Sequence, residues 1–467
     1  MTHYHRYQIA TQPAPPRARH PSRFRVRVSR VRLAQLIFGE LIHYRGDLPV
    51  VLSRPCVYGV FSGPVGGFAP REQLCVGCLR CTVQYPDMVQ VTPNPARLAL
   101  GDSYMDPDRV DTILYEAATG RVPVRGAGYR GRFSGPGWDS MWTDMSEIVR
   151  PTRDGIHGRE FISTAVDLGQ RPSFLQLDAS GTPVAERPRS LALPVPFIFD
   201  RPALSIRTPE LMGVLAGAAA AVQTLWLAPI DWALRESSVR SGVVPIVRPS
   251  DREQLRRLPT PPEVFEIEGW DRAPACEIRV QFPKSLIVVR APFGENLLAW
   301  VEDGFRLFHL TADYHGHTPV GFVLDAIRAA HESLVTAGVR EQVTLVGSGG
   351  IIAPEHLAKA IVSGLDLVAL DTALWVALQA GCLGECRTEE AARFSLPELD
   401  PTWGIQRLAN LSSAWRDELL EVLGAMGIRD VRRLRGEVGR AMFQPELERE
   451  AFAGIPGYPD DEIAVRD

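Results

Sequence analysis

The chain has 467 residues, which is too long for one compact core, so we expect two or three domains. Hydrophobic residues make up 45% and charged residues 23%, close to the average of globular proteins, and this composition excludes wholesale disorder. The net charge of -4 creates no global field that would hold nucleic acid or an anionic membrane, so we expect neither as a partner.

Residues 1–50 are predicted to form a basic N-terminal arm. Arginines alternate with valine and phenylalanine between Arg23 and Arg32, which predicts a β-strand, and an amphipathic turn follows over residues 33–42. The chain opens with polar, aromatic and proline residues instead of an apolar leader, so we expect no signal peptide. The simplest interpretation is a surface arm docked on the rest of the protein.

Residues 51–185 are rich in glycine, proline and aromatic residues, which predicts a loop-rich domain that needs an additional cross-link for stability. The chain has seven cysteines, an odd number, and three of them lie between Cys75 and Cys81. That pattern is a poor disulfide framework and favours a reducing compartment, so we expect a cytoplasmic protein.

Cys75, Cys78 and Cys81 form a C-x-x-C-x-x-C run, the spacing with which three thiolates bind one face of an iron–sulfur cubane. Cys56 is the nearest other thiol in the same region and is the predicted fourth ligand of a 4Fe–4S cluster. A structural zinc ion on the same four sulfurs, or a 3Fe–4S cluster without Cys56, is the alternative. A cluster that only staples the domain would have no redox role.

Residues 186–386 alternate short apolar runs with helical segments, which is typical of a parallel α/β domain. We expect helices over residues 209–222, 320–337 and 354–363, and strands over residues 191–199, 243–247, 278–282, 286–289, 305–310, 343–346 and 367–370. This number of elements favours a (β/α)8 TIM-barrel-like domain, with a doubly wound sheet as the alternative. Residues 387–467 are predicted to form a C-terminal helical extension.

Two segments near the end of this domain form a candidate phosphate site. The predicted strand at 343–346 leads into Ser348, Gly349 and Gly350, and the strand at 367–370 leads through Asp371 into Thr372 and Ala373. Loops after the seventh and eighth strands of such barrels commonly bind a phosphate through backbone amides. Plain β-to-α corners are the alternative, and Asp371 favours it because a carboxylate repels phosphate.

The barrel region resembles the FMN-binding synthase domain of glutamate synthase through residues 346–351, 358–366, 370–373 and 215–219, a likeness that covers about residues 190–386. The front half is similar to the extension of glutamate-synthase-related proteins that carry no glutaminase domain. The resemblance implies FMN at the barrel mouth, with its phosphate at Gly349, Gly350, Thr372 and Ala373, and electron transfer between flavin and cluster. Arg290 takes the place of the family's catalytic lysine, and Lys284 is the other candidate cation beside the flavin.

The sequence also departs from the family pattern. Asp371 replaces a glycine, Gln223-Thr-Leu-Trp226 stands where a glycine-rich flavin loop begins, and Thr2 stands where an amidotransferase has a cysteine nucleophile. Where the family has a second cysteine cluster, only Cys382 and Cys386 remain. We therefore expect ammonia to come from elsewhere and the second cluster to be lost.

Two functions follow from this comparison. The first is an iron–sulfur flavoprotein oxidoreductase, acting on CH-NH2 donors, that passes electrons between a 4Fe–4S cluster and FMN with a ferredoxin-like electron carrier or a partner subunit. Glutamate formation from 2-oxoglutarate is a narrower form of this function. The second is a catalytically retired barrel that serves as an iron–sulfur structural or electron-transfer subunit of a larger complex. Cationic residues in the segment 150–159 offer an anion site or an interdomain ion-pair network: Arg150, Arg153, His157 and Arg159.

Overall fold

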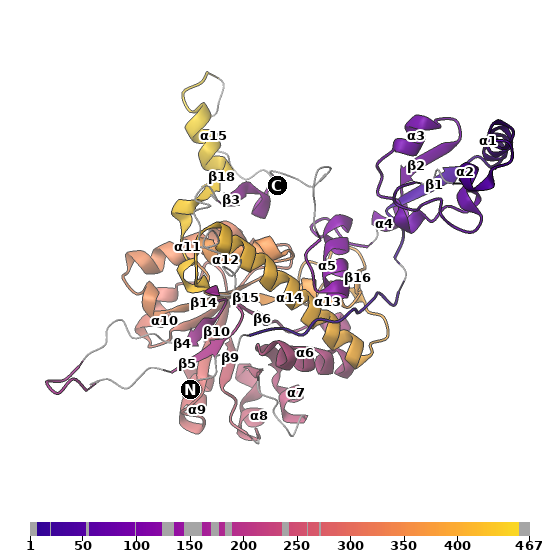
Figure 1. Ribbon diagram of the computed structural model, residues 1–467. Helices are drawn as coiled ribbons and strands as arrows, with labels where there is room; N and C mark the ends of the chain where they lie inside the picture. Colours follow the sequence, from indigo (N-terminus) through magenta and orange to yellow (C-terminus); the bar gives the residue numbers. More distant parts are fainter. Residues whose placement is uncertain are drawn as a thin grey trace. The chain divides into compact units, whose positions relative to one another are not determined.

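The computed structural model describes residues 7–18, 20–52, 56–98, 100–123, 135–143, 161–169, 177–182, 189–235, 242–258, 260–269 and 272–456. The chain forms two compact units, and Figure 1 shows its elements. We call residues 17–107 the cysteine unit, and residues 1–16 together with 108–467 the barrel unit. These boundaries differ from the predicted ranges, because the second half of the basic arm belongs to the cysteine unit and its first residues belong to the barrel unit.

The cysteine unit is built on a two-stranded antiparallel sheet. Strand β1 (Phe24–Val28) pairs with β2 (Val89–Pro93), so the strand predicted from the alternating arginines is confirmed. Val26 is buried whereas Arg25 and Arg27 point to solvent, which is the alternation of a strand with one covered face. The helices of the unit are α1 (Arg30–His43), α2 (Leu48–Leu52), α3 (Arg80–Gln84) and α4 (Pro95–Leu98).

The barrel unit contains eight parallel strands that close into a barrel, which confirms the (β/α)8 prediction over the doubly wound sheet. In chain order the strands are β6 (Phe197–Phe199), β7 (Trp226–Pro229), β8 (Val243–Val247), β9 (Val264–Glu268), β10 (Leu286–Pro292), β11 (Leu307–Thr311), β14 (Thr344–Ser348) and β15 (Leu367–Leu370). Each strand pairs with its sequence neighbours, and β15 closes the ring against β6. The carboxyl ends of all eight strands therefore meet at one mouth.

Helices surround the barrel (Figure 1). They are α5 (Pro107–Thr119), α6 (Pro209–Val222), α7 (Ile230–Arg235), α8 (Arg252–Arg256), α9 (Arg272–Gln281), α10 (Leu297–Glu302), α11 (Val323–Thr336), α12 (Pro354–Ser363), α13 (Thr372–Ala377) and α14 (Pro401–Ala425). The bounds of α6 and α12 are those predicted. Among the described residues, no helix combines the length and hydropathy that a membrane span requires.

The strand predicted over residues 278–282 is wrong, because this segment belongs to α9 and its final turn. Ala275, Ile278 and Phe282 are buried at a spacing of three and four residues, while Val280 is 83% exposed. This is the period of a helix with one face on the barrel. The apolar residues at 278, 280 and 282 imitate the alternation of a strand only over that short window.

The long helix α14 joins distant parts of the barrel unit. The Arg407 side chain is fully buried and donates hydrogen bonds to the carbonyl oxygens of Ala377, Ala14 and Leu114. Asn410 in turn donates to the carbonyl oxygen of Gln12. Residues 7–16 are therefore fixed along α14 as part of the barrel unit.

Shorter elements complete the barrel unit. A hairpin-like pair, β4 (Val166–Gly169) with β5 (Ser190–Leu193), precedes the first barrel strand. Further two-stranded pairs are β3 (Met141–Thr143) with β18 (Ala441–Phe443), β12 (His317–Thr318) with β13 (Gly321–Phe322), and β16 (Gly381–Cys382) with β17 (Phe394–Ser395). The last helix is α15 (Gln444–Phe452).

Candidate functional site

The four predicted cluster ligands line one pocket of the cysteine unit: Cys56, Cys75, Cys78 and Cys81. The pocket has an empty volume of about 290 Å³, including its opening to solvent. Cys75 is buried and Cys78 is exposed, so the pocket reaches from the apolar core of the unit to its surface.

Two backbone positions shape the loop that carries the thiols. Gly77 has φ of 70° and Leu79 has φ of 60°, so left-handed residues lie on both sides of Cys78. A Cβ atom on Gly77 would lie 2.3 Å from the ring of Phe24, which explains why glycine is required there. The sharp reversals allow residues only three apart in sequence to present their side chains to the same pocket.

The thiols of this pocket influence one another electrostatically. Burial raises the pKa of Cys75, the backbone N–H of Gly77 opposes this rise, and the neighbouring Cys56 and Cys78 raise the pKa further. Burial likewise raises the pKa of Cys81, with Cys75 and Cys78 adding to the effect. Four thiolates so close together repel one another, and a bound cation removes this cost. The donor set therefore fits a metal cluster.

The barrel mouth is organised around Arg290 on β10. Its guanidinium binds both carboxylate oxygens of Asp200, at 2.9 and 3.0 Å, and lies 3.1 Å from Oε1 of Glu266. Burial would raise the pKa of Asp200, but the positive charges of Arg290 and His309 outweigh it and hold this pKa well below its usual range. The cation predicted to face the flavin is thus held by two carboxylates of the chain itself.

His309 on β11 belongs to the same cluster. Its Nδ1 lies 2.7 Å from Oε2 of Glu266, and the side chain is fully buried, as expected for a core histidine. Its Nε2 atom has no hydrogen-bond partner among the described residues. A buried ring nitrogen without a partner is unusual. The polar groups of this part of the barrel interior, Arg290 and Glu266, lie at the other ring nitrogen, Nδ1.

A second layer of ion pairs surrounds this cluster. Arg201 binds Glu268 at 2.6 Å and Glu389 at 2.7 Å, and Arg207 and Arg248 pair with the same two carboxylates. Burial would raise the pKa of Glu268, but the hydrogen bond and charge of Arg201 lower it to about 2. Both carboxylates are therefore paired with arginines, whereas Nε of Arg201 and Nε of Arg207 have no hydrogen-bond partner among the described residues.

Asp371 occupies the start of helix α13, where the predicted phosphate would bind. Its carboxylate accepts hydrogen bonds from the backbone N–H of Thr372 and, at 3.0 Å, from the Thr372 hydroxyl. Burial raises the pKa of Asp371 to about 7, and the charge of Asp200 contributes to this rise. A side-chain carboxyl thus takes the position of an anion at the helix N-terminus.

The other predicted phosphate ligands are buried as well. Ser348, Thr372 and Ala373 are at most 2% exposed, and Gly349 and Gly350 are also buried. The carbonyl of Gly350 accepts a 2.8 Å hydrogen bond from the indole of Trp138, itself buried. Both loops are therefore covered by protein, and a phosphate bound there would be contacted through their backbone amides.

Lys284 lies at the opposite end of the barrel from this mouth. It precedes β10, whose first residue is Leu286, and its side chain is exposed. Arg290 lies four residues further along the strand and reaches the mouth through Asp200. The two predicted cations therefore cannot serve one site, and Lys284 is no candidate for contact with a flavin at the mouth.

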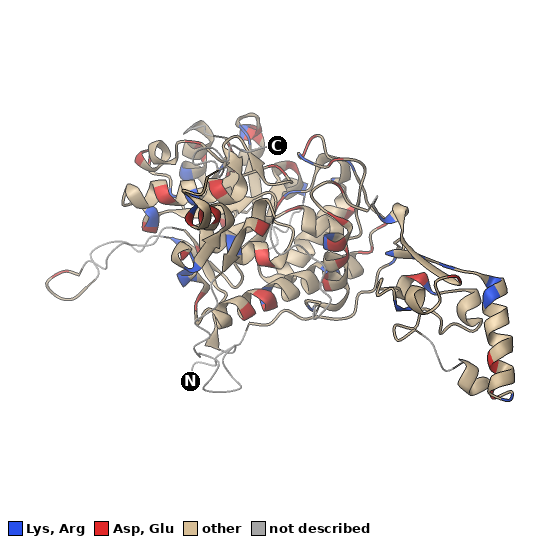
Figure 2. Ribbon diagram, turned by 90° about the horizontal axis from the view of Figure 1, so that it is seen from above, with Lys and Arg blue, Asp and Glu red and all other residues tan. Residues whose placement is uncertain are grey.

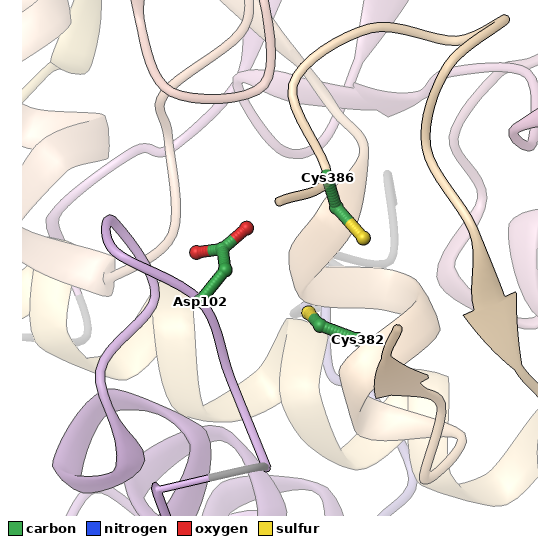
Figure 3. Close-up of side chains that lie close together, drawn as sticks. All are labelled: Asp102, Cys382 and Cys386. Carbon is green, nitrogen blue, oxygen red and sulfur yellow. The ribbon is translucent and has the colours of Figure 1, made fainter. Parts of the chain in front are cut away.

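Cys382 and Cys386 lie side by side in the barrel unit (Figure 3). Their sulfur atoms are within 4.8 Å of each other, and both residues are buried. Asp102, which Figure 3 also labels, is a residue of the cysteine unit. Two thiols remain here where the family's second cluster uses three, and the loss of that cluster stays a prediction.

Sequence reasoning missed most of the carboxylates at the mouth. Asp200 directly follows the buried run Phe197–Phe199, and Glu266 interrupts the apolar run of β9. An acidic residue within or just after a buried strand is the signal that would have found both. The predicted cationic group at residues 150–159 lies outside the described residues.

Comparisons with known proteins complete this picture. Residues 313–429, which include β14, β15 and the loops that follow them, match the family model described as the conserved region in glutamate synthase. The chain is 24% identical to the archaeal-type glutamate synthase [NADPH] of Dehalococcoides mccartyi over 438 residues, 78% of this chain and 86% of that protein. The archaeal glutamate synthase [NADPH] of Methanocaldococcus jannaschii is 39% identical over 134 residues, 26% of each chain.

The similarity extends over nearly the whole length of a further relative. The archaeal glutamate synthase [NADPH] of Archaeoglobus fulgidus is 30% identical over 499 aligned positions, which cover 89% of this chain and 93% of that protein. A match of this extent includes residues of both the cysteine unit and the barrel unit. The chain belongs to the glutamate synthase family.

Proposed function

We propose that this protein is an iron–sulfur oxidoreductase of the glutamate synthase family that binds a 4Fe–4S cluster through Cys56, Cys75, Cys78 and Cys81. The observation that carries the proposal is the convergence of these four side chains on one pocket. When bound, such a cluster supplies one-electron transfer. The chain itself would hold the thiolates and line the pocket with the apolar side chains of Val26, Val60 and Val91. The backbone N–H of Gly77 would donate a hydrogen bond to the sulfur of Cys75.

Zinc is less well supported than a cluster. A tetrahedral zinc site has Zn–S bonds of about 2.3 Å, so its sulfur atoms lie less than about 4 Å apart. Among the described residues, no three of the four sulfur atoms in this pocket lie within 4.8 Å of one another. This wider spacing of the sulfur atoms favours a polyatomic cluster over zinc.

A second candidate function is glutamate formation at the barrel mouth with FMN. Membership of the family and the full-length similarity to the A. fulgidus protein favour it. Two contacts make it less favourable, since Asp371 binds Thr372 at the predicted phosphate position and Arg290 is neutralised by Asp200 and Glu266. If the mouth has lost its flavin, the barrel serves as the scaffold of an iron–sulfur subunit.

Cofactor analysis of the full chain, purified without oxygen, tests both functions. We expect iron and acid-labile sulfide in equal amounts, a broad absorbance shoulder in the visible range, and no zinc. Flavin released by denaturation would be quantified in the same sample. Zinc without iron would refute the cluster, and stoichiometric FMN would favour the second candidate. A cytoplasmic location stays a prediction based on the cysteine pattern.

A further inference from the structure

Three large apolar side chains surround the opening of the cysteine pocket. Tyr58, Val76 and Leu79 line the pocket and yet are 50%, 45% and 41% exposed. We call these three residues the apolar rim. Packing within the cysteine unit leaves them in solvent, and clustered exposed apolar residues on a folded protein mark interaction sites.

Leu79 is held on this rim in an unfavourable backbone conformation. Its φ of 60° lies in the left-handed region, where glycine and asparagine are favoured and leucine carries a steric cost. A glycine would satisfy the turn without this cost. The leucine at this position therefore adds apolar surface beside the exposed Cys78.

The cysteine unit is basic whereas the rest of the chain is acidic. Residues 17–107 contain 12 arginines and 6 acidic residues, and the remaining residues contain 39 cationic and 49 acidic ones. Figure 2 shows the arginines along β1 and at the start of α1. Arg80, also exposed, directly follows Leu79. The apolar rim thus lies in a positive field, which attracts an acidic surface.

We propose that Tyr58, Val76 and Leu79, with Arg80 beside them, form the docking face for an acidic electron-carrier protein. The inference rests on the proposed cluster, because Cys78 is the exposed ligand and the partner would approach the bound group at this loop. An apolar centre within a charged surround is the anatomy of a protein interface, and a small one suits a transient redox complex. Nucleic acid would be held by the positive charge alone and would not need the rim.

Calorimetry on the full chain with its cluster reconstituted tests the docking face. The probe is a strongly acidic plant-type ferredoxin in its oxidised form, and basic cytochrome c is the charge-reversed control. We expect ferredoxin to bind and cytochrome c not to bind. We also expect ferredoxin affinity to fall by about tenfold or more between roughly 20 and 200 mM salt, because the attraction is screened.

Two variants separate the apolar from the charged contribution. The first variant combines Val76→Thr, which keeps the side-chain shape of valine, with Leu79→Asn, which tolerates the left-handed conformation at residue 79. Loss of the two apolar side chains should weaken ferredoxin binding about tenfold. Arg80→Gln should weaken it about threefold and reduce its salt dependence. Val280→Thr combined with Leu177→Asn, two exposed positions of the barrel unit, is the matched control and should bind like the wild type.

Iron and sulfide are measured in every sample before titration. A wild-type chain that cannot be loaded refutes the proposed cluster and, with it, the docking face. A loaded wild-type chain that does not bind ferredoxin, or binds it no better than the Val76→Thr/Leu79→Asn variant with equal iron content, refutes the docking face alone. Equal binding of cytochrome c also overturns the proposal, because the partner would then not be selected by charge.

Discussion

The two polar centres of this protein differ in how their groups are satisfied. In the cysteine pocket, the thiols of Cys75 and Cys81 are surrounded by further thiols that raise the cost of ionisation. At the barrel mouth, Asp200 faces Arg290 and Glu268 faces Arg201, whereas Asp371 binds Thr372. The first centre gains from an added cation, whereas the second is already neutralised from within.

This difference indicates which site is built for a ligand. Several thiol donors converge on the open cysteine pocket, and the repulsion between their ionised forms is relieved only when a cation binds. Opposite charges that pair at about 3 Å in a buried mouth already offset one another, so a ligand there would gain less from electrostatic attraction. Family membership alone predicts a ligand at both centres, while the contacts favour the cysteine pocket.

The largest expected effect comes from removing a thiol. Cys75→Ser or Cys81→Ser should abolish most of the iron content, because each supplies a predicted ligand that lines the pocket. Cys276→Ser, on the exposed face of α9, is the matched control and should retain all iron. Iron retained at the wild-type level in Cys81→Ser would show that the cluster is not bound through the thiol of Cys81, contrary to the proposed ligand set.

Removing the central cation of the mouth should destabilise the barrel unit. Arg290→Met leaves Asp200 and Glu266 buried without their partner, which costs about 3–5 kcal/mol of unfolding free energy. Arg235→Met removes an exposed pair with Asp231 and should change stability by less than about 0.5 kcal/mol. Urea unfolding compares the two, and similar stabilities would show that the mouth is not held together by this ion pair.

The protonation of Asp371 gives a pH dependence with a defined sign. Its pKa is raised to about 7 in the fold, whereas an unfolded aspartate titrates near pH 3.9. Between these values the folded chain keeps a proton that the unfolded chain releases, so the stability of the wild type falls as pH rises from about 4 to 7. Asp371→Asn cannot titrate and lacks this loss.

The stability of Asp371→Asn relative to wild type should therefore grow by roughly 2–4 kcal/mol over that range and stay constant above it. Urea unfolding at several pH values measures the difference. The other buried carboxylates, including Asp200 and Glu268, titrate in both proteins and cancel. A difference that is independent of pH would mean that Asp371 is ionised throughout, with less burial than its 2% exposure indicates.

The smallest expected effect concerns flavin. Asp371→Gly removes the carboxylate that binds Thr372 at the predicted phosphate position. Because this carboxylate would repel the FMN phosphate, its removal should raise the affinity for FMN by about tenfold. Quenching of flavin fluorescence measures it. Asp87→Gly, at an exposed aspartate of the cysteine unit, is the control. Tight FMN binding by the wild type itself would show that the mouth rearranges around its ligand.

Much of the fold could be predicted because its signals are local. The glycine and proline boundaries of α12 and the apolar runs of β8 and β15 are readable within a few residues. Strand β9 was missed because Glu266 and Glu268 interrupt its apolar run. Those two carboxylates are tolerated in a barrel strand only because Arg290 and Arg201 reach them from other strands.

The sequence by itself determined the cysteine spacing, the parallel α/β rhythm and the glycine-rich corner after β14. Only the tertiary structure decided that Arg290 is neutralised, since its partner Asp200 lies 90 residues away and meets it because both strands end at the same mouth. Only the tertiary structure placed Cys56 in the pocket of Cys75. Backbone turns depend on neighbouring residues, whereas charge neutralisation and ligand convergence depend on side chains that chain folding brings together.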